Sequence, residues 1–202
     1  MAYEGVKYKT VFVDNKIPGD PRINELRNWC KVFHEKNLAP YYPGGTHGNM
    51  SFRLAPGKNS FIITAARSSF AENLSDDSFF TVLNADLNEK TLQVSGVENR
   101  EPSSEAMLHF SVYKERPDVQ AILHGHCETI SQYSNKMGIP TTTEFVESGT
   151  MKIIESVLEV LGSHTFIEIK DHGFLAMAGS IQKAGELAMK MLKGSSKFSA
   201  SD

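Results

Sequence analysis

The hydrophobic and polar positions of this chain follow two spacings, one typical of strands and one typical of helices. Four short apolar runs in the first half of the chain are bounded by turn-forming residues, as strands are. They cover residues 49–54, 60–64, 79–83 and 91–94, and the turn-rich segment 84–88 joins the last two. Because short connections join antiparallel rather than parallel strands, this half of the chain predicts a mainly antiparallel sheet.

Helical spacing of apolar residues precedes and follows these runs. Asp20 and Pro21 are typical of a helix start, and an apolar stripe with helical spacing follows them to Phe33. A second helix is predicted from Ser103 to about Glu115. Three later helices are predicted at 127–136, from 151 to the stop signal Gly162, and from 181 to Gly194.

The pattern predicts one domain of the α/β class. Further strand-like runs lead into residue 126 and cover 166–169 and 174–178. Strands and helices are interspersed without a strict βαβ rhythm or an internal repeat, so we expect a single sheet covered by helices on both faces. The expected organisation is an extended lead over 1–19, a domain over 20–194 and a flexible tail over 195–202.

Charge and composition exclude several kinds of partner. The 202 residues include 21 Lys and Arg and 24 Asp and Glu, and the formal net charge of −3 offers no basic field for nucleic acid. No apolar run approaches the ~20 residues that cross a bilayer, and no signal peptide is expected. Cys30 and Cys127 indicate reduced thiols of a cytoplasmic protein, although a disulfide between them stays open.

The segment Ile122–His126 is the strongest indication of chemistry. Side chains two residues apart on a strand point to the same face, so His124 and His126 can bind one ion together. Catalytic zinc sites usually take three protein ligands and leave one position for water or substrate. His172 lies between two strand-like runs, where a turn would aim it inward. The spacing alone leaves open that these histidines only make hydrogen bonds.

Two polar segments can bind an anion. The glycine-rich turn 44–49 offers backbone N–H groups with the side chains of Thr46 and Asn49, but such a segment can also be only a turn. The segment 101–105 opens a helix, and its serines either cap that helix or receive a phosphate while Glu105 faces a metal.

A further histidine lies close to this second segment. His109 follows Glu105 by four residues on the same predicted helix face. It can therefore hydrogen-bond the carboxylate of Glu105 and hold it in place.

The order of these motifs resembles the class II aldolase/adducin family, which includes L-fuculose-phosphate aldolase and L-ribulose-phosphate 4-epimerase. The matching segments read GTHGNMSFR, PSSEAMLHFSVYKERPDVQAILHGH and KDHGFLAMAG, within a stretch from about Asn24 to Lys193. The resemblance implies a three-layer αβα fold with a mainly antiparallel central sheet. It also implies, commonly, a C4 tetramer with active sites at subunit interfaces.

The same resemblance implies roles for individual residues. It implies that His124, His126 and His172 bind zinc or another divalent metal. Glu105 would be the acid/base, or a fourth ligand in the empty enzyme. The residues that would line a substrate phosphate pocket are Thr46, Gly48, Asn49, Ser103 and Ser104.

This chain departs from the family pattern at two places. Where the family aldolases carry Thr or Ser followed by Gly after the second strand, this chain reads Thr-Ala-Ala-Arg over 64–67. Arg67 can supply a replacement cation, because its planar fork suits anions, or can be a solvated loop residue. The tyrosine proton donors of the aldolases are also not evident near Thr143 and Glu144 or in the short tail.

Together these features predict a cytoplasmic, zinc-dependent aldolase, a lyase of carbohydrate metabolism and a homotetramer. It would cleave a short, anionic sugar phosphate to dihydroxyacetone phosphate and an aldehyde through a metal-stabilised enediolate. A metal-dependent dehydratase, decarboxylase or epimerase remains an alternative. A non-catalytic, adducin-like interaction module is disfavoured, because such members lack the zinc histidines.

Overall fold

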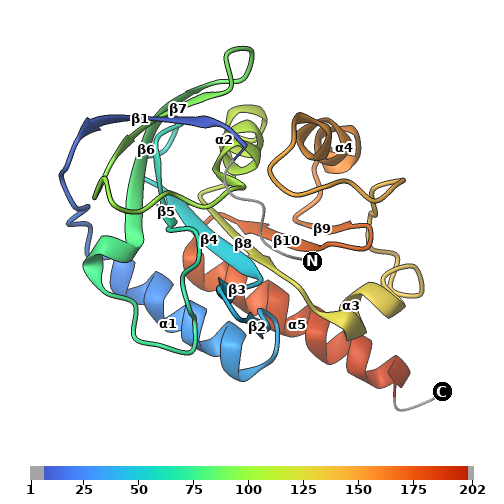
Figure 1. Ribbon diagram of the computed structural model, residues 1–202. Coiled ribbons are helices and arrows are strands. Elements are labelled where there is room, and N and C mark those ends of the chain that lie inside the picture. The colour runs from blue at the N-terminus through green and yellow to red at the C-terminus, as the bar shows by residue number, and fades with distance from the viewer. Residues whose placement is uncertain (1–6, 200–202) are drawn as a thin grey trace.

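A computed structural model describes residues 7–199 of the chain, and its centre is one mixed sheet of eight strands (Figure 1). The strand order is β1 (Lys9–Asp14), β7 (Thr91–Ser95), β6 (Phe79–Asp86), β5 (Phe61–Thr64), β4 (Gly48–Arg53), β8 (Ala121–Gly125), β10 (Gly173–Ala178) and β9 (Phe166–Ile169). All neighbours are antiparallel except β1, which pairs with β7 in parallel. A small hairpin of β2 (Tyr41–Tyr42) and β3 (Gly45–Thr46) lies outside this sheet.

Helices cover both faces of the sheet, which confirms the predicted fold class (Figure 1). The helices α2 (Ala106–Glu115) and α4 (Met151–Leu161) contribute to one apolar cluster. The helices α1 (Ile23–Glu35), α3 (Glu128–Tyr133) and α5 (Ile181–Ser199) contribute to the other, and a short 3₁₀ helix, η1 (Asp76–Ser78), precedes β6. No helix within residues 7–199 is both long and apolar enough to cross a membrane.

The alternation of side chains along each central strand decides which layer they join. In β8, Ile122 packs into the cluster under α2 and α4, whereas Ala121 and Leu123 pack into the cluster under α1 and α5. Because both faces of β8 are buried, its sequence is a continuous apolar run. The same alternation turns His124 toward the α2 face.

The structure corrects the predicted amino-terminal boundary, because residues 9–14 belong to the sheet. The strand β1 lies at its edge, and Phe12 packs against the cluster under α2 with its ring centroid 6.3 Å from that of Phe80. Only one face of β1 is covered, so its apolar signal is too weak to read as a strand from the sequence. Of the lead predicted over 1–19, residues 1–6 lie outside the described part of the chain.

The predicted stop at Gly194 is wrong, because α5 continues to Ser199. Gly194 is a packing position: a Cβ there would lie 2.9 Å from Cε of Met137. Ser195, predicted to lie in a flexible tail, is fully buried, and its hydroxyl donates to the carbonyl of Leu192 at 2.9 Å. Residues 200–202 of that tail lie outside the described chain. The predicted free thiols Cys30 and Cys127 are both buried.

Replacing Gly185 by alanine is expected to destabilise the protein. A Cβ at Gly185, in α5, would collide with the indole ring of Trp29 in α1. Overpacking of this kind costs about 1–3 kcal/mol, more than the ~1 kcal/mol that alanine gains over glycine inside a helix. The measurement is the free energy of unfolding in urea.

Gly194→Ala is the matched control, because the side chain it meets is the flexible end of Met137. This variant should be neutral or more stable by up to ~1 kcal/mol, since the position is helical. Equal losses of stability in both variants would contradict the packing described for α5.

Candidate metal centre and active site

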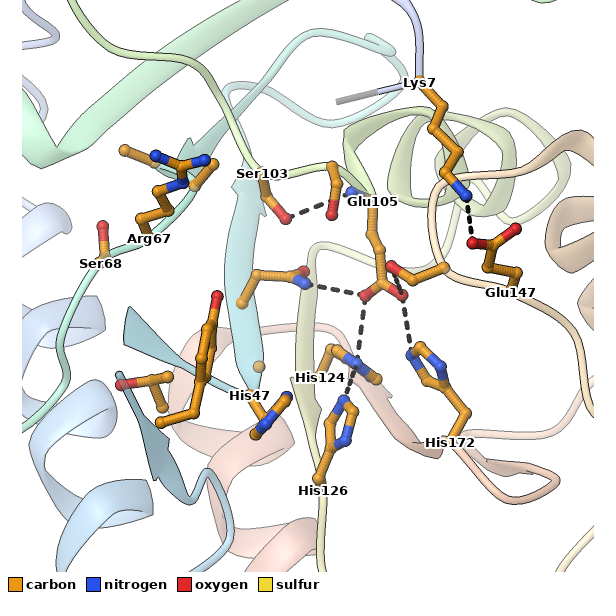
Figure 2. Close-up of a pocket in the computed structure, with 18 of the residues that line it drawn as sticks. Lys7, His47, Arg67, Ser68, Ser103, Glu105, His124, His126, Glu147 and His172 are labelled. Atoms are coloured by element: carbon orange, nitrogen blue, oxygen red, sulfur yellow. Dashed lines mark hydrogen bonds and ion pairs between the residues drawn. The ribbon is translucent and has the colours of Figure 1, made fainter. Parts of the chain in front are cut away.

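Three histidines converge at one end of β8 (Figure 2). His124 is in β8 and His126 follows the end of the strand, and their Nε2 atoms lie 3.0 Å apart. His172 comes from the turn between β9 and β10, where Asp171 adopts a φ of +56°. Its ring centroid lies 5.2 Å from that of His124 and 4.8 Å from that of His126. One ligating atom from each of the three lies within 4.8 Å of the others, so they could hold a metal ion.

The hydrogen bonds of these rings suit a metal ion. Nδ1 of His124 lies 2.8 Å from the carbonyl oxygen of Phe174, and a proton on Nδ1 leaves Nε2 with a free lone pair. Nε2 of His172 is buried and has no aligned hydrogen-bond partner among the described residues. Two ring nitrogens that face each other at 3.0 Å, with Nε2 of His172 beside them, form a donor set that zinc and similar divalent ions accept.

Burial shifts the protonation of these rings. It lowers the pKa of His124 and holds the pKa of His126 well below its ordinary value, so both are neutral, as metal ligands must be. Burial also acts to lower the pKa of His172, but the adjacent charge of Glu105 outweighs it and raises that pKa.

Glu105 lies immediately before α2 and points its carboxylate at the histidines (Figure 2). Its Oε1 lies 2.9 Å from Nε2 of His172, and its Oε2 lies 3.1 Å from Nε2 of His124. Asn49 donates to Oε2 at 2.8 Å, and Ser148 donates to Oε1 at 3.3 Å. Burial of this side chain acts to raise its pKa, but the two imidazoles and the hydrogen bonds hold the pKa well below its ordinary value.

The predicted site residues all line one cavity of about 320 Å³. They are Thr46, Gly48, Asn49, Arg67, Ser103, Ser104, Glu105, His124, His126 and His172. The predicted serine cap of α2 is not found: the helix begins at Ala106, and the Ser103 hydroxyl accepts from the backbone N–H of Glu105 at 3.3 Å. The hydroxyl of Thr46 accepts from the backbone N–H of Phe70 at 2.8 Å.

Arg67 lies at the edge of this cavity in an unusual backbone conformation. Its φ is +58°, in the left-handed region, and its side chain is exposed. The backbone of Gly45 packs directly against it, since a Cβ at Gly45 would lie 2.8 Å from the Cα of Arg67. Arg67 and Ser68 lie on one side of the site, and Lys7 and Glu147 lie on the other (Figure 2).

The predicted hydrogen bond from His109 to the carboxylate of Glu105 is wrong. Nδ1 of His109 lies 2.7 Å from the hydroxyl of Ser51 instead. Because α2 begins after Glu105, the carboxylate of that residue turns toward the metal-ligand candidates and away from the helix face that His109 occupies.

Several residues of the cavity were missed by sequence reasoning. The sequence assigned no role to the side chain of His47, but its ring packs between Tyr42 and His126, with centroid distances of 4.4 and 5.1 Å. Burial raises the pKa of Tyr42, while the nearby Arg67 acts to lower it. The position of His47 within the glycine-rich turn 44–49 could have indicated that its side chain lines the cavity.

One wall of the cavity comes from segments that carry no motif. Lys7 forms an ion pair with Glu147 at 2.6 Å, and the loop before α4 also contributes Phe145 and Ser148. Nothing in the sequence places the segment before β1 beside this loop.

Comparison with known proteins identifies the family. The chain matches the family model described as the Class II Aldolase and Adducin N-terminal domain over residues 24–193. It is 32% identical over 106 residues to a protein of Mycoplasma pneumoniae described as a probable L-ribulose-5-phosphate 4-epimerase. That match covers 52% of this chain and only 40% of the relative.

Solved structures share the fold. An L-fuculose 1-phosphate aldolase is similar with a TM-score of 0.71 and 22% identity, over 90% of this chain and 86% of that one. A sugar-phosphate aldolase from Thermotoga maritima is similar with a TM-score of 0.70 and 19% identity, over 86% and 91%. The family match spans most of the chain and contains every residue of the histidine and glutamate cluster. The chain therefore belongs to the class II aldolase and adducin family.

Proposed function

We propose that this protein is a metal-dependent enzyme that cleaves a carbon–carbon bond of a short sugar phosphate, as a class II aldolase does. The observation that carries the proposal is the cluster of three imidazoles with the buried carboxylate of Glu105 about 3 Å from two of them. An interaction module would not need to bury these groups together, because a buried carboxylate is costly unless it is paired.

His124, His126 and His172 are the residues that would hold the metal, and we infer zinc from a donor set of three imidazoles. A divalent ion held there supplies a Lewis acid for the negative charge that develops on the oxygens of the substrate. The chain's own contribution is to fix the three rings, as His124 shows through its contact with the carbonyl of Phe174.

Glu105 is the residue that we assign to proton transfer. Aldol cleavage of a ketose removes the proton of the hydroxyl on the fourth carbon, and the electron pair of the bond between the third and fourth carbons moves to the carbonyl. An aldehyde and an enediolate result, and a proton then returns to the third carbon to give the ketone. The Glu105 carboxylate lies beside the three imidazoles, within reach of a substrate held there. It can accept the proton of the hydroxyl and return a proton to the third carbon.

The opposite part of the cavity supports binding of an anion. Ser103 and Ser104 precede α2, and Thr46, Gly48 and Asn49 line the same cavity. Hydroxyl and backbone N–H groups of this kind bind phosphate. Arg67, at the cavity edge, adds the positive charge, so we infer a phosphorylated or otherwise anionic substrate.

Epimerisation is the second candidate function. It is favoured by the relative described as a probable L-ribulose-5-phosphate 4-epimerase. Cleaving the bond between the third and fourth carbons and re-forming it on the other face of the aldehyde inverts the fourth carbon, so the same groups can serve both reactions. A C4 homotetramer stays a prediction from the family resemblance.

Elemental analysis of the purified protein is expected to find about one divalent ion per chain. The double variant His124→Ala/His126→Ala removes two of the three inferred ligands and should bring the metal content close to zero. The matched control is His34→Ala/His164→Ala, which removes two histidines that do not line the cavity. If the first double variant keeps its metal, the ion is bound elsewhere.

Glu105→Gln is expected to lower turnover ~100-fold or more when the divalent ion is supplied in excess, because the amide cannot carry the proton. The substrates to screen are phosphorylated ketoses, with aldehyde release read by a coupled assay and inversion at the fourth carbon read by NMR. A role in helix stability alone would instead lower the free energy of unfolding by about 1 kcal/mol and leave the rate intact.

Inorganic phosphate and phosphoglycolohydroxamate, an enediolate mimic, are expected to inhibit, and Arg67→Ala should weaken inhibition by both about tenfold. The control is Arg100→Ala, which makes the same change in net charge outside the cavity lining. Equal turnover of an unphosphorylated ketose, without inhibition by either anion, would contradict the assignment of the anion pocket.

A further inference from the structure

The helix α2 is joined to the strand β4 by a ladder of three side-chain contacts, which we call the β4–α2 ladder. Alternate residues of the strand meet every fourth residue along the helix and its entry. Asn49 donates to Oε2 of Glu105 at 2.8 Å, the hydroxyl of Ser51 lies 2.7 Å from Nδ1 of His109, and Arg53 donates from Nη2 to the carbonyl of Tyr113 at 2.7 Å. The contact of Asn49 with Glu105 is thus one end of the β4–α2 ladder.

The spacing of the β4–α2 ladder follows from the two backbone geometries. Two residues of a strand advance about 6.6 Å, and four residues of a helix advance about 6.0 Å. Over three contacts the mismatch is only about 1 Å, so each contact can form with the helix in a single position along the strand. Sliding α2 along β4 would break all three at once.

The far end of the ladder is anchored by a buried arginine. Arg53 is 1% exposed, and besides Tyr113 it donates to the carbonyls of Val119 and Arg116, each at 3.0 Å. Its guanidinium also lies over the ring of Tyr113, 4.6 Å from the centroid. This end therefore fixes the carboxyl-terminal half of α2, away from the site.

The middle contact is sealed inside the protein. Ser51 is 0% exposed and His109 is 0% exposed, and the Ser51 hydroxyl also lies 2.8 Å from the hydroxyl of Tyr113. Burial lowers the pKa of His109 to about 3, so this ring is neutral at physiological pH. Loss of Ser51 would leave Nδ1 of His109 buried without a hydrogen bond, which is costly and favours a shift of the helix. Loss of His109 would leave Ser51 with Tyr113 as its remaining partner and remove the link to this position of the helix.

We propose that Ser51 and His109 are positioning residues of the active site, which set the position of α2 along β4 and so hold the Glu105 carboxylate at its distance from His124 and His172. The role of Glu105 in this proposal rests on the proposed function. Neither residue lines the cavity or belongs to the group of three histidines. They act through the helix that leads away from Glu105.

Binding of Co²⁺ tests the proposal without a substrate. Ser51→Ala removes the hydroxyl of the middle contact. His109→Gln also removes this contact, because glutamine places its amide near the position of Nε2 rather than Nδ1. Displacing Glu105 weakens the negative field around the three imidazoles, so Co²⁺ affinity, measured by competition with a chromophoric chelator, should fall about tenfold. His109→Asn places an amide at the position of Nδ1 and should restore the affinity to within about threefold of the parent.

Ser111→Ala is the matched control. Ser111 is also buried in α2, but its hydroxyl donates to the carbonyl of Met107 within the helix. This variant should leave Co²⁺ affinity unchanged. Unchanged affinity in Ser51→Ala and His109→Gln, or failure of His109→Asn to differ from His109→Gln, would overturn the proposal.

A double-mutant cycle separates positioning from general loss of structure. In a Glu105→Gln background, Ser51→Ala should cause no further loss of Co²⁺ affinity, because the group that it positions has lost its charge. Losses that simply multiply would mean that Ser51 acts independently of Glu105, and the proposal would be wrong.

The same cycle read by urea unfolding in the presence of a chelator tests the ladder in the metal-free protein. The change in the unfolding equilibrium constant of the double variant Ser51→Ala/Glu105→Gln should differ from the product of the two single changes by about threefold or more. If the parent protein binds no Co²⁺, the proposed function fails, while this unfolding cycle still decides the ladder. Independent effects in it would overturn the positioning role.

Discussion

The cluster of His124, His126 and His172 depends on a close approach of backbones that only glycine allows. Gly125 lies between His124 and His126 in sequence, and it pairs with Gly48 of β4 on one side and with β10 on the other. A Cβ at Gly125 would collide with the carbonyl oxygen of Leu38, and a Cβ at Gly48 would lie 2.7 Å from the carbonyl oxygen of His124. Because the strands close up here, side chains from β4, β8 and the β9–β10 turn reach one small volume.

The same closure excludes water and decides the electrostatics of the site. Glu105 is 2% exposed, and a buried carboxylate is stable only when hydrogen bonds and opposite charge surround it. Asn49 and Ser148 supply hydrogen bonds, and the imidazoles of His124 and His172 lie next to its two oxygens. The buried carboxylate and the imidazoles that flank it therefore stabilise one another.

Local periodicity explains which parts of this site could be predicted from the sequence. His124 and His126 could be paired because strand geometry relates residues two apart, and His172 was a candidate from its place between two strand-like runs. The motif order of the family then implied the metal-ligand role of all three and the acid/base role of Glu105. The spacing of four residues wrongly predicted a hydrogen bond between the side chains of His109 and Glu105. That spacing relates side chains only within a helix, and α2 begins after Glu105. Lys7 could not be predicted, since its place beside Glu147 depends on an edge strand and a loop that lie far apart in the sequence.

The cavity joins a wall made by the sheet and the entry to α2 to walls made of loops. The sheet and the β4–α2 ladder hold the histidines and Glu105. Arg67 lies in a turn instead, in a left-handed conformation that costs a non-glycine residue about 1–2 kcal/mol. The backbone of Gly45 packs against Arg67 and holds it in this conformation, which directs its side chain to the cavity edge. A change in such a turn can alter the charge at the cavity edge without moving the carboxylate or the three imidazoles.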